Sequence, residues 1–244
     1  MATRCCIFCG TTGPLTKEHV VPAWLQNHVG GEDKGRFRGV HMSAFGEPIS
    51  ERQASPNSHT AGIVCAHCNN GWMSRLESSF KELLPRLQTK MDPRLFSKRE
   101  RRCISVWLIK TGIIAHWSSN YRKILPSSFC RSAYKGTSIP AGTVIFGGNT
   151  QGIKTINWHQ SNISIIRLPN SEINHIDYKT GTFQFNFSIE DIFLGFAWHK
   201  YTNQRYRITT SKVHNFYPRP TFNKETIRHN PYFLASPYIS LKRE

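Results

Sequence analysis

Two cysteine pairs with the same spacing stand out in the N-terminal third of the chain. Cys6 and Cys9 form the first pair and Cys65 and Cys68 the second, with two residues between the members of each. That spacer lets one turn present both sulfurs to one ion, and two such turns complete a tetrahedron. Cys5 offers another register, but its longer spacer fits such a turn less well. The pattern predicts a structural zinc site.

The two pairs are separated by 55 residues, which is more than zinc ribbons usually have. Residues 26–62 are rich in Gly, Ser, Pro and charge, with little periodicity. We expect a long loop or a loosely structured insertion there. Such an insertion would account for the extra length.

Residues suited to phosphodiester hydrolysis lie between and beside the cysteine pairs. That reaction needs a base to deprotonate water, a divalent cation, and ligands for the cation. His19 is a natural base, since histidine exchanges protons near neutral pH. Glu18 can offer one hard oxygen to Mg²⁺ or Mn²⁺, and Asn69 a second through its amide carbonyl. These three residues are the candidate catalytic set.

The elements around these residues are short. Residues 15–22 are partly β-branched and stop at Pro22, which predicts a strand, and residues 62–65 predict a second. Neighbouring side chains on a strand point to opposite faces, so Glu18 and His19 share a site only if the strand bends or ends there. Helical spacing of apolar residues predicts a helix over residues 69–84, ended by Pro85.

Taken in order, Cys6-x-x-Cys9, Glu18-His19 and Cys65-x-x-Cys68-Asn69 resemble the zinc-containing branch of the HNH (ββα-metal) endonucleases. That branch includes phage junction-resolving nucleases and many bacterial and phage enzymes, some of them in defence. The resemblance implies a hairpin and a helix around one catalytic metal, stapled by four cysteines. It also implies that Glu18 and Asn69 bind the catalytic metal and that His19 is the general base.

The resemblance covers roughly residues 4–80 and departs from the family pattern in three ways. Glu stands at position 18 where Asp is usual, the loop between the halves is long, and the third helix position has no clear match. Glu77 is a ligand, a support for a ligand, or a solvated helix charge. Asn70 rivals Asn69 or caps the helix. His59 is a further candidate near the site, or a surface histidine.

The charge predicts a polyanionic partner. The 244 residues carry 32 Lys+Arg and 15 Asp+Glu, a formal charge of +17. Lysine and arginine contacts to phosphates supply most sequence-independent affinity for nucleic acid. We expect DNA first and RNA as an alternative, with no membrane anchor. Between positions 98 and 135 there are nine basic residues and one acid, and the candidate phosphate contacts are Lys98, Arg99, Arg101, Arg102, Lys110, Arg122 and Lys123.

The first residues do not resemble a signal peptide, and the apolar stretch around residues 103–117 falls short of the ~20 residues of a membrane helix. We therefore expect a cytoplasmic protein, in a bacterial or phage-infected cell. In a reducing compartment, Cys103 and Cys130 are expected to be core thiols. The oligomeric state is open, a homodimer included.

The second half predicts one helix and then an antiparallel β unit. The helix spans residues 98–117, and strands are expected at 143–146, 153–158, 163–168, 182–187, 193–199 and 205–209, followed by an extended tail. The fold class is α+β, with a zinc-stapled module over residues 1–95 and a basic helix plus β-rich domain over residues 96–244. The competing function is a zinc-stabilised nucleic-acid-binding module without catalysis.

Overall fold

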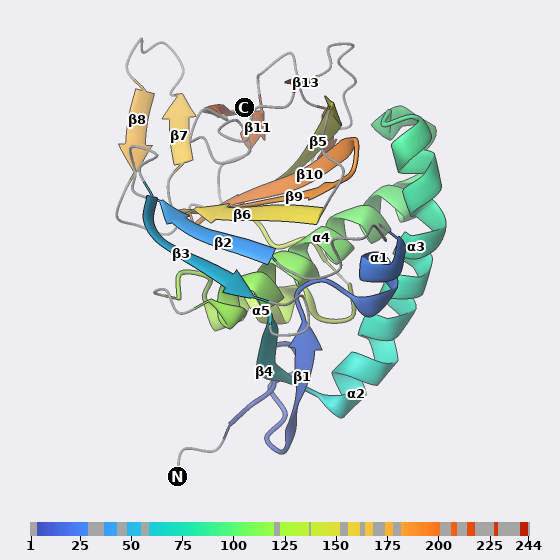
Figure 1. The fold of residues 1–244 in the computed structure, drawn as a ribbon, viewed down its shortest axis with the longest axis vertical. Coiled ribbons are helices and arrows are strands. Elements are labelled where there is room, and N and C mark those ends of the chain that lie inside the picture. The colour runs from blue at the N-terminus through green and yellow to red at the C-terminus, as the bar shows by residue number, and fades with distance from the viewer. Residues whose placement is uncertain are drawn as a thin grey trace.

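The protein combines helices with largely antiparallel sheets, and its C-terminal region is rich in strands (Figure 1). This agrees with the predicted α+β class. The computed structural model describes residues 4–28, 37–42, 48–54, 59–119, 123–136, 138–151, 156–161, 164–167, 174–177, 182–200, 206–208, 214–217, 227–228 and 240–243.

The N-terminal region is a two-stranded hairpin followed by a long helical segment. The strands are antiparallel, and Leu15 pairs with Cys65 at one end and His19 with Thr60 at the other. The elements are β1 (Leu15–His19), α1 (Ala23–His28), β4 (Thr60–Cys65), α2 (Ala66–Cys68), η2 (Asn69–Met73) and α3 (Ser74–Thr89).

The helical segment differs from its prediction at both ends. It begins at Ala66 rather than Asn69, and it passes through a π-helical stretch kinked at Gly71, where φ is −93° and ψ is −106°. Its end is also later than predicted, because α3 continues through Pro85 to Thr89. The buried residues of α3, which include Phe80, Leu84 and Leu87, extend beyond the proline. Packing of this apolar face outweighs the lost hydrogen bond.

The predicted loose insertion contains regular structure. Strands β2 (Phe37–Met42) and β3 (Pro48–Ala54) pair antiparallel, with Phe37 opposite Ala54, and α1 lies at its start. The expectation of a loop over all of residues 26–62 was therefore wrong. The alternation in these strands is too weak to distinguish them from a polar loop in the sequence.

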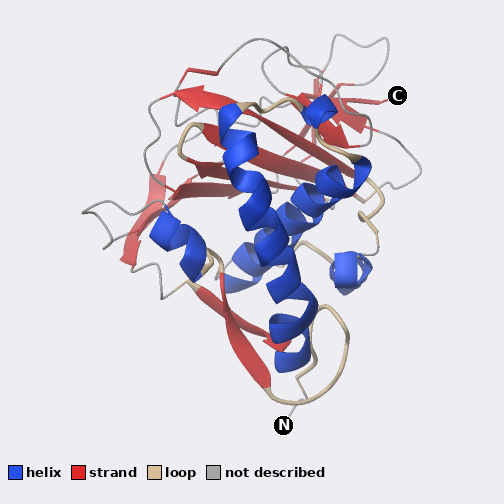
Figure 2. Ribbon diagram, turned by 90° about the vertical axis from the view of Figure 1, so that its right-hand side faces the viewer, coloured by secondary structure: helices blue, strands red, loops and turns tan. Residues whose placement is uncertain are grey.

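Helix α4 (Lys98–Ser118) is the central element of the molecule. Its bounds match those of the predicted helix, residues 98–117, to within one residue. Ser97 and Glu100 form a capping box at its start, in which each side chain bonds the other residue's backbone N–H. Every residue from Ile104 to His116 is buried. Figure 2 shows helices crossing at the centre of the molecule, between the large sheet and the β1–β4 hairpin. Burial on all sides explains why this part of α4 has apolar residues on every face, with Lys110 as its one charged side chain.

The large sheet has the order β12-β5-β10-β9-β6, with β13 pairing β5 outside this path. A four-stranded sheet has the order β11-β14-β7-β8. The strands are β5 (Thr143–Gln151), β6 (Ile156–Ser161), β7 (Ser164–Arg167), β8 (Asn174–Asp177), β9 (Thr182–Ile189), β10 (Ile192–His199), β11 (Tyr206–Ile208), β12 (His214–Tyr217), β13 (Ile227–Arg228) and β14 (Ser240–Arg243). Two short helical segments precede them, α5 (Ser127–Ser132) and η4 (Tyr134–Gly136), and η3 (Pro93–Leu95) precedes α4.

The six predicted strands are present, although their ends differ, and four more were missed. Strands β8, β12, β13 and β14 lie in segments without clear alternation, and the last two occupy the region predicted as an extended tail. Strand β14 pairs parallel with β7, through Leu241 opposite Ile166. Partners so distant in sequence leave no local signal.

The aromatic residues of β9 pack toward α4. Phe187 lies edge-on to Trp107 of α4 at 5.6 Å between ring centroids, and Phe185 and Phe196 approach Gly112, where an added Cβ would overlap the Phe196 ring. The predicted alternation of aromatic and polar residues in β9 is correct. The polar residues are buried too, since Gln184 is 2% and Asn186 1% exposed. One core cluster therefore joins the hairpin, α3, α4 and the sheet.

Candidate metal centre

The four predicted cysteines converge at the base of the β1–β4 hairpin. The Sγ atoms of Cys6, Cys9, Cys65 and Cys68 all lie within 4.8 Å of one another. The Sγ atoms of Cys9 and Cys65 are 3.6 Å apart. Tetrahedral zinc with Zn–S bonds of 2.3 Å requires sulfurs about 3.8 Å apart. The cluster therefore fits a zinc ion in both ligand type and spacing.

Local backbone structure forms the first half of this cluster. The chain turns tightly after Cys6, whose N–H donates to the Thr11 carbonyl at 2.9 Å, while the Gly10 N–H donates to the Cys6 carbonyl. Gly10 adopts a φ of +77°, which a side chain would disfavour. Cys5 is exposed and bridges Thr12 outside the cluster. The alternative register through Cys5 is therefore not the one adopted.

The second half comes from the junction of β4 and α2. Cys65 ends the strand and Cys68 ends the short helix, and Cys68 is fully buried. Phe8, between Cys6 and Cys9 in the chain, and Trp72, just after Cys68, pack edge to face at 5.2 Å between ring centroids. Both rings are buried. His67, between the two cysteines, is exposed, as expected.

The thiols of the cluster differ in acidity. Burial alone would raise the pKa of Cys9, but hydrogen bonds with the Thr11 side chain and backbone, and with Cys6 and Cys65, lower it to about 6. Burial raises the pKa of Cys68 and of Cys65. A bound cation would favour the thiolate form of all four, since zinc binding releases thiol protons.

Glu18 lies on β1, where the pairing with β4 shifts register. Thr16 pairs with Val64 and Glu18 with Ala61, so β4 carries one more residue than β1 in this interval. The hairpin is thus irregular beside Glu18, and His19 is the last residue of the strand. This meets the condition under which Glu18 and His19 could share a site. Burial raises the pKa of Glu18, while the nearby Lys110 ammonium opposes that effect.

Lys110 brings α4 into contact with this carboxylate. Its Nζ atom lies 3.7 Å from Glu18 Oε1 and forms an ion pair with Glu77 Oε1. The Lys110 side chain is 0% exposed, so it cannot contact a nucleic-acid phosphate. The prediction that Lys110 is a phosphate contact was therefore wrong, because the ammonium points into the core and pairs with two carboxylates.

The Glu77 carboxylate contacts three side chains and is not a solvated charge. Besides Lys110 on Oε1, its Oε2 accepts hydrogen bonds from Trp24 Nε1 at 2.7 Å and Trp107 Nε1 at 2.9 Å. The side chain is 14% exposed. This corrects the reading of Glu77 as a solvated helix charge. Trp24 and Trp107 come from α1 and α4, so Glu77 joins three helices.

Asn69 lies beside the strand that carries Glu18. Its Nδ2 donates to Thr16 Oγ1 at 3.1 Å, and Thr16 Oγ1 donates to the Val64 carbonyl at 2.8 Å. Thr16 is two residues before Glu18, and alternate residues of a strand share a face. This hydrogen bond uses the side-chain NH₂ group of Asn69. The side-chain carbonyl oxygen of Asn69, which would bind a cation, takes no part in it. Asn70 is exposed and makes no side-chain cap.

The histidines lie at the open end of the hairpin. His19 is half-buried, and its ring forms no hydrogen bond within the described part of the chain. His59 precedes β4, and its carbonyl accepts from the Val20 N–H at 2.9 Å. The His59 ring packs edge-on to Trp158 of β6 at 5.2 Å, and burial lowers its pKa. His59 therefore links the hairpin to the large sheet.

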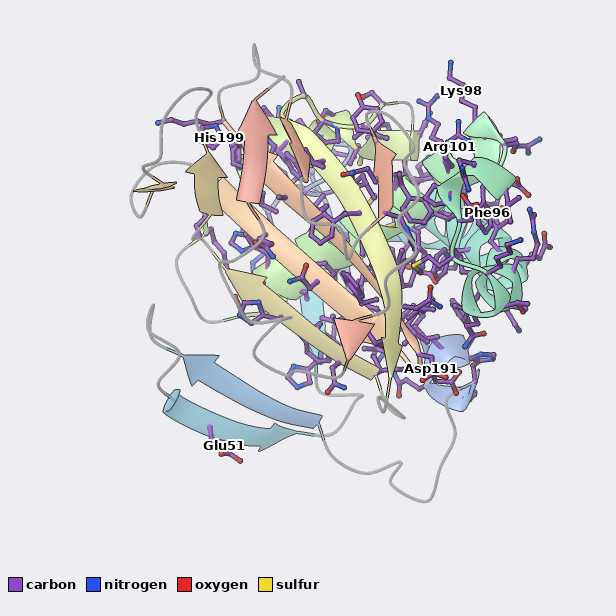
Figure 3. All side chains as sticks on the ribbon, turned by 90° about the horizontal axis from the view of Figure 1, so that it is seen from above. Glu51, Phe96, Lys98, Arg101, Asp191 and His199 are labelled. Carbon is purple, nitrogen blue, oxygen red and sulfur yellow. The ribbon has the colours of Figure 1, made fainter. Side chains whose placement is uncertain are left out.

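Some of the other predicted phosphate contacts are exposed, and others donate hydrogen bonds to backbone carbonyls. Lys98 and Arg99 are exposed at the start of α4, and Figure 3 shows Lys98 and Arg101 on the same side of the molecule. Arg101 donates to the carbonyls of Pro93 and Phe96, and Arg102 to that of Gly136. Lys123 donates to the last carbonyls of α4. Arg122 lies outside the described residues.

The role of Lys110 was missed, although the sequence carries a signal for it. Lys110 is the one charged residue in the otherwise apolar stretch of residues 103–117. A charge in a buried helix face requires a partner of opposite sign. The sequence alone does not identify that partner, because Glu18 and Glu77 are distant in the chain.

Comparisons with protein-family models, curated proteins and solved structures found no match. Among the described residues, no helix is long and apolar enough to span a membrane.

Proposed function

We propose that this chain is an HNH-type endonuclease that hydrolyses phosphodiester bonds of nucleic acid, with DNA as the first candidate. One observation supports it above the others. The four clustered cysteines join the ends of β1 and β4 to the start of the helical segment, and this places Asn69 beside the strand that carries Glu18 and His19. The same order of residues gives the resemblance to the HNH family.

Zinc has a structural role in this proposal. Four cysteines complete a tetrahedron, which has no open position for water. The cluster sits at one end of the hairpin, and His19 ends β1 at the other. The zinc would therefore hold the hairpin against the helix without taking part in hydrolysis.

Glu18 and Asn69 are the proposed ligands of a catalytic Mg²⁺ or Mn²⁺. One carboxylate and one amide oxygen match the small number of protein ligands that Mg²⁺ commonly uses, with water and substrate phosphate as the others. When bound, the cation would offset negative charge on the phosphate and on the leaving oxygen. Within the described residues, the cysteines are the one group of three or more candidate His, Cys, Asp and Glu ligands.

His19 is the proposed general base. Its ring takes a proton from water as the water oxygen attacks phosphorus. The bond from phosphorus to the 3′ oxygen breaks, and that oxygen takes a proton from a second water molecule. The products are a 5′-phosphate and a 3′-hydroxyl, as the family resemblance implies. The His19 side chain is half-buried and thus not closed off from solvent.

A cleavage assay tests this function. The zinc-loaded protein is freed of Mg²⁺ by dialysis against buffer without divalent cations and incubated with duplex, branched and single-stranded DNA and with RNA, with and without Mg²⁺ or Mn²⁺. We expect cleavage that the added cation restores and that His19→Ala abolishes with zinc content unchanged. His67→Ala, at an exposed histidine of the same module, is the matched control and should cleave normally.

The contact between Lys110 and Glu18 favours one alternative. A carboxylate already paired with a buried ammonium suits a zinc-stabilised nucleic-acid-binding module that does not cleave. Salt-sensitive binding with no cleavage of any substrate would support that alternative, and Mg²⁺-restored cleavage would exclude it. Retained cleavage in His19→Ala would remove His19 as the base.

A further inference from the structure

Lys110 is a buried charge contributed by the second half of the chain to the proposed active site. It lies in the middle of α4, and its side chain is 0% exposed. Taking an ammonium out of water is costly unless it is paired and hydrogen-bonded. A buried lysine such as Lys110 therefore requires a carboxylate partner in the core.

Glu77 is sufficient to neutralise that ammonium. It forms the shorter ion pair with Lys110, and its other oxygen is fixed by the indole N–H groups of Trp24 and Trp107. One buried cation with one anchored carboxylate is a complete pair. Stability alone would not require another carboxylate in the same place, because each added charge brings its own desolvation cost.

Glu18 is nevertheless the second carboxylate in the cluster. Its Oε1 lies 3.7 Å from Lys110 Nζ, and its side chain is 14% exposed. The cluster thus holds two carboxylates against one ammonium. If both carboxylates are ionised, the single ammonium of Lys110 does not balance their negative charge. A divalent cation at Glu18 would supply positive charge there.

The contact also distinguishes the two oxygens of Glu18. Lys110 approaches Oε1, so Oε2 remains for a cation. The side chain of a glutamate has several rotatable bonds, and fixing one oxygen removes much of that freedom before a ligand binds. The chain from Trp24 and Trp107 through Glu77 to Lys110 would provide such a fixed support.

We propose that Lys110 is a positioning residue that holds Glu18 for the catalytic cation, so that the active site of the N-terminal module is completed by helix α4. The inference rests on the proposed function. It assigns the second half of the chain a part in the site beyond binding nucleic acid. Groups that support a metal ligand commonly change metal affinity or activity by about 10- to 100-fold when they are removed.

Mn²⁺ binding provides a readout that does not depend on cleavage. The probe is Mn²⁺ itself, measured by electron paramagnetic resonance on zinc-loaded full-length protein that carries His19→Ala. We compare Lys110→Met and Lys110→Gln with Lys81→Met, the control, which removes an exposed lysine from α3. Zinc content and thermal unfolding are recorded for each variant.

We expect Lys110→Met to weaken Mn²⁺ binding by about 10- to 100-fold and Lys81→Met to leave it unchanged. With His19 present, Lys110→Met should lower kcat and leave the KM for DNA unchanged, because the buried ammonium does not reach phosphate. Unchanged Mn²⁺ affinity in a folded Lys110→Met protein would overturn the proposal. Tighter binding would also overturn it, since Lys110 would then compete with the cation.

Trp24→Phe keeps the test decisive if the Lys110 variants do not fold. It removes one hydrogen bond to Glu77 and retains an aromatic ring. We expect a weaker effect on Mn²⁺ affinity in the same direction, and no effect would count against the proposal. If the parent protein neither binds Mn²⁺ nor cleaves, the proposed function fails with it. If the parent binds and cleaves but the variants match it, the role of Lys110 alone is lost.

Discussion

The sulfurs of Cys9 and Cys65 lie 3.6 Å apart although 56 positions separate the two residues in sequence. Their contact joins the turn before β1 to the end of β4, and Cys6 and Cys68 complete the cluster. The cluster therefore ties together segments that a long insertion separates.

We expect one zinc per chain and loss of that zinc in Cys65→Ser. A structural zinc contributes about 10 kcal/mol or more to the folding of a small module, so the variant should unfold at a markedly lower temperature. Metal analysis by mass spectrometry and thermal unfolding followed by circular dichroism measure both effects. Cys5→Ser, at the exposed neighbouring cysteine, should keep its zinc. Full zinc content in Cys65→Ser would contradict the four-cysteine site.

Gly112→Ala should destabilise the protein despite the higher helix propensity of alanine. The added methyl would overlap the Phe196 ring and contact Phe185, and overpacking a core costs roughly 1–3 kcal/mol. Helix propensity returns about 1 kcal/mol. The added Cβ would lie well inside the contact distance of a Phe196 ring atom, so the upper part of the overpacking range applies. We expect a net loss of up to about 2 kcal/mol in the free energy of unfolding, measured by urea denaturation.

Gly62→Ala is the control for this substitution. A Cβ at Gly62 has no neighbour within 4 Å, so we expect a change smaller than about 0.5 kcal/mol. Equal stability of the Gly112→Ala variant and the parent would show that α4 and the sheet are less closely packed than described.

Acid should weaken the fold through His116. Burial and the Lys123 ammonium lower the pKa of His116 to about 4, and its Nε2 accepts from the Ile124 N–H at 2.9 Å. The unfolded chain takes up a proton near pH 6.5 and the folded chain only near pH 4. Stability is therefore complete above pH 6.5 and falls as the pH drops toward 4, by at most about 3 kcal/mol from this residue.

His116→Gln should reduce that pH dependence, since glutamine keeps an acceptor and does not titrate. Urea denaturation at several pH values between 4 and 7 measures the slope. His28→Gln, at an exposed histidine, should leave it unchanged. Burial also lowers the pKa of His159 to about 4, so part of the slope should remain in His116→Gln. An unaltered slope would argue against a neutral, hydrogen-bonded His116.

Nucleic-acid binding should depend on the exposed start of α4. Each phosphate contact contributes about 0.9 to the slope of log affinity against log salt concentration for duplex DNA. If Lys98 and Arg99 each contact a phosphate, the Lys98→Gln, Arg99→Gln double variant should lower that slope by about 1.8. Fluorescence anisotropy at several salt concentrations measures it. Lys81→Gln, exposed on α3, is the control, and equal slopes in all proteins would place the DNA elsewhere.

The four-cysteine cluster and α4 could be predicted because their signals are local. Paired cysteines with a two-residue spacer indicate one ion, and the apolar stretch beginning near Cys103 indicates a buried helix. The strands β9 and β10 were also predicted, and β9 has the clearer signal because its aromatic and polar residues alternate. The division into two domains near residue 95 stays a prediction, as do the catalytic roles of Glu18, His19 and Asn69.

What could not be predicted depends on contacts between distant residues. The partners of Lys110 are 33 and 92 positions away, at Glu77 and Glu18. The same holds for β14, which pairs with β7. At Pro85 a local signal was misleading. The proline predicted a helix end, but α3 continues past it because Leu87 packs into the core.

The pairing of His19 with Thr60 brings together the two ends of the segment between them, which holds most of the insertion. The entropy lost on closing such a loop grows only with the logarithm of its length, and doubling the length costs about 0.6 kcal/mol. The insertion can therefore gain or lose whole segments while the cysteine cluster and Glu18 stay in place. For protein engineers it is a natural graft site, where a reporter or a targeting module could be inserted without rebuilding the hairpin.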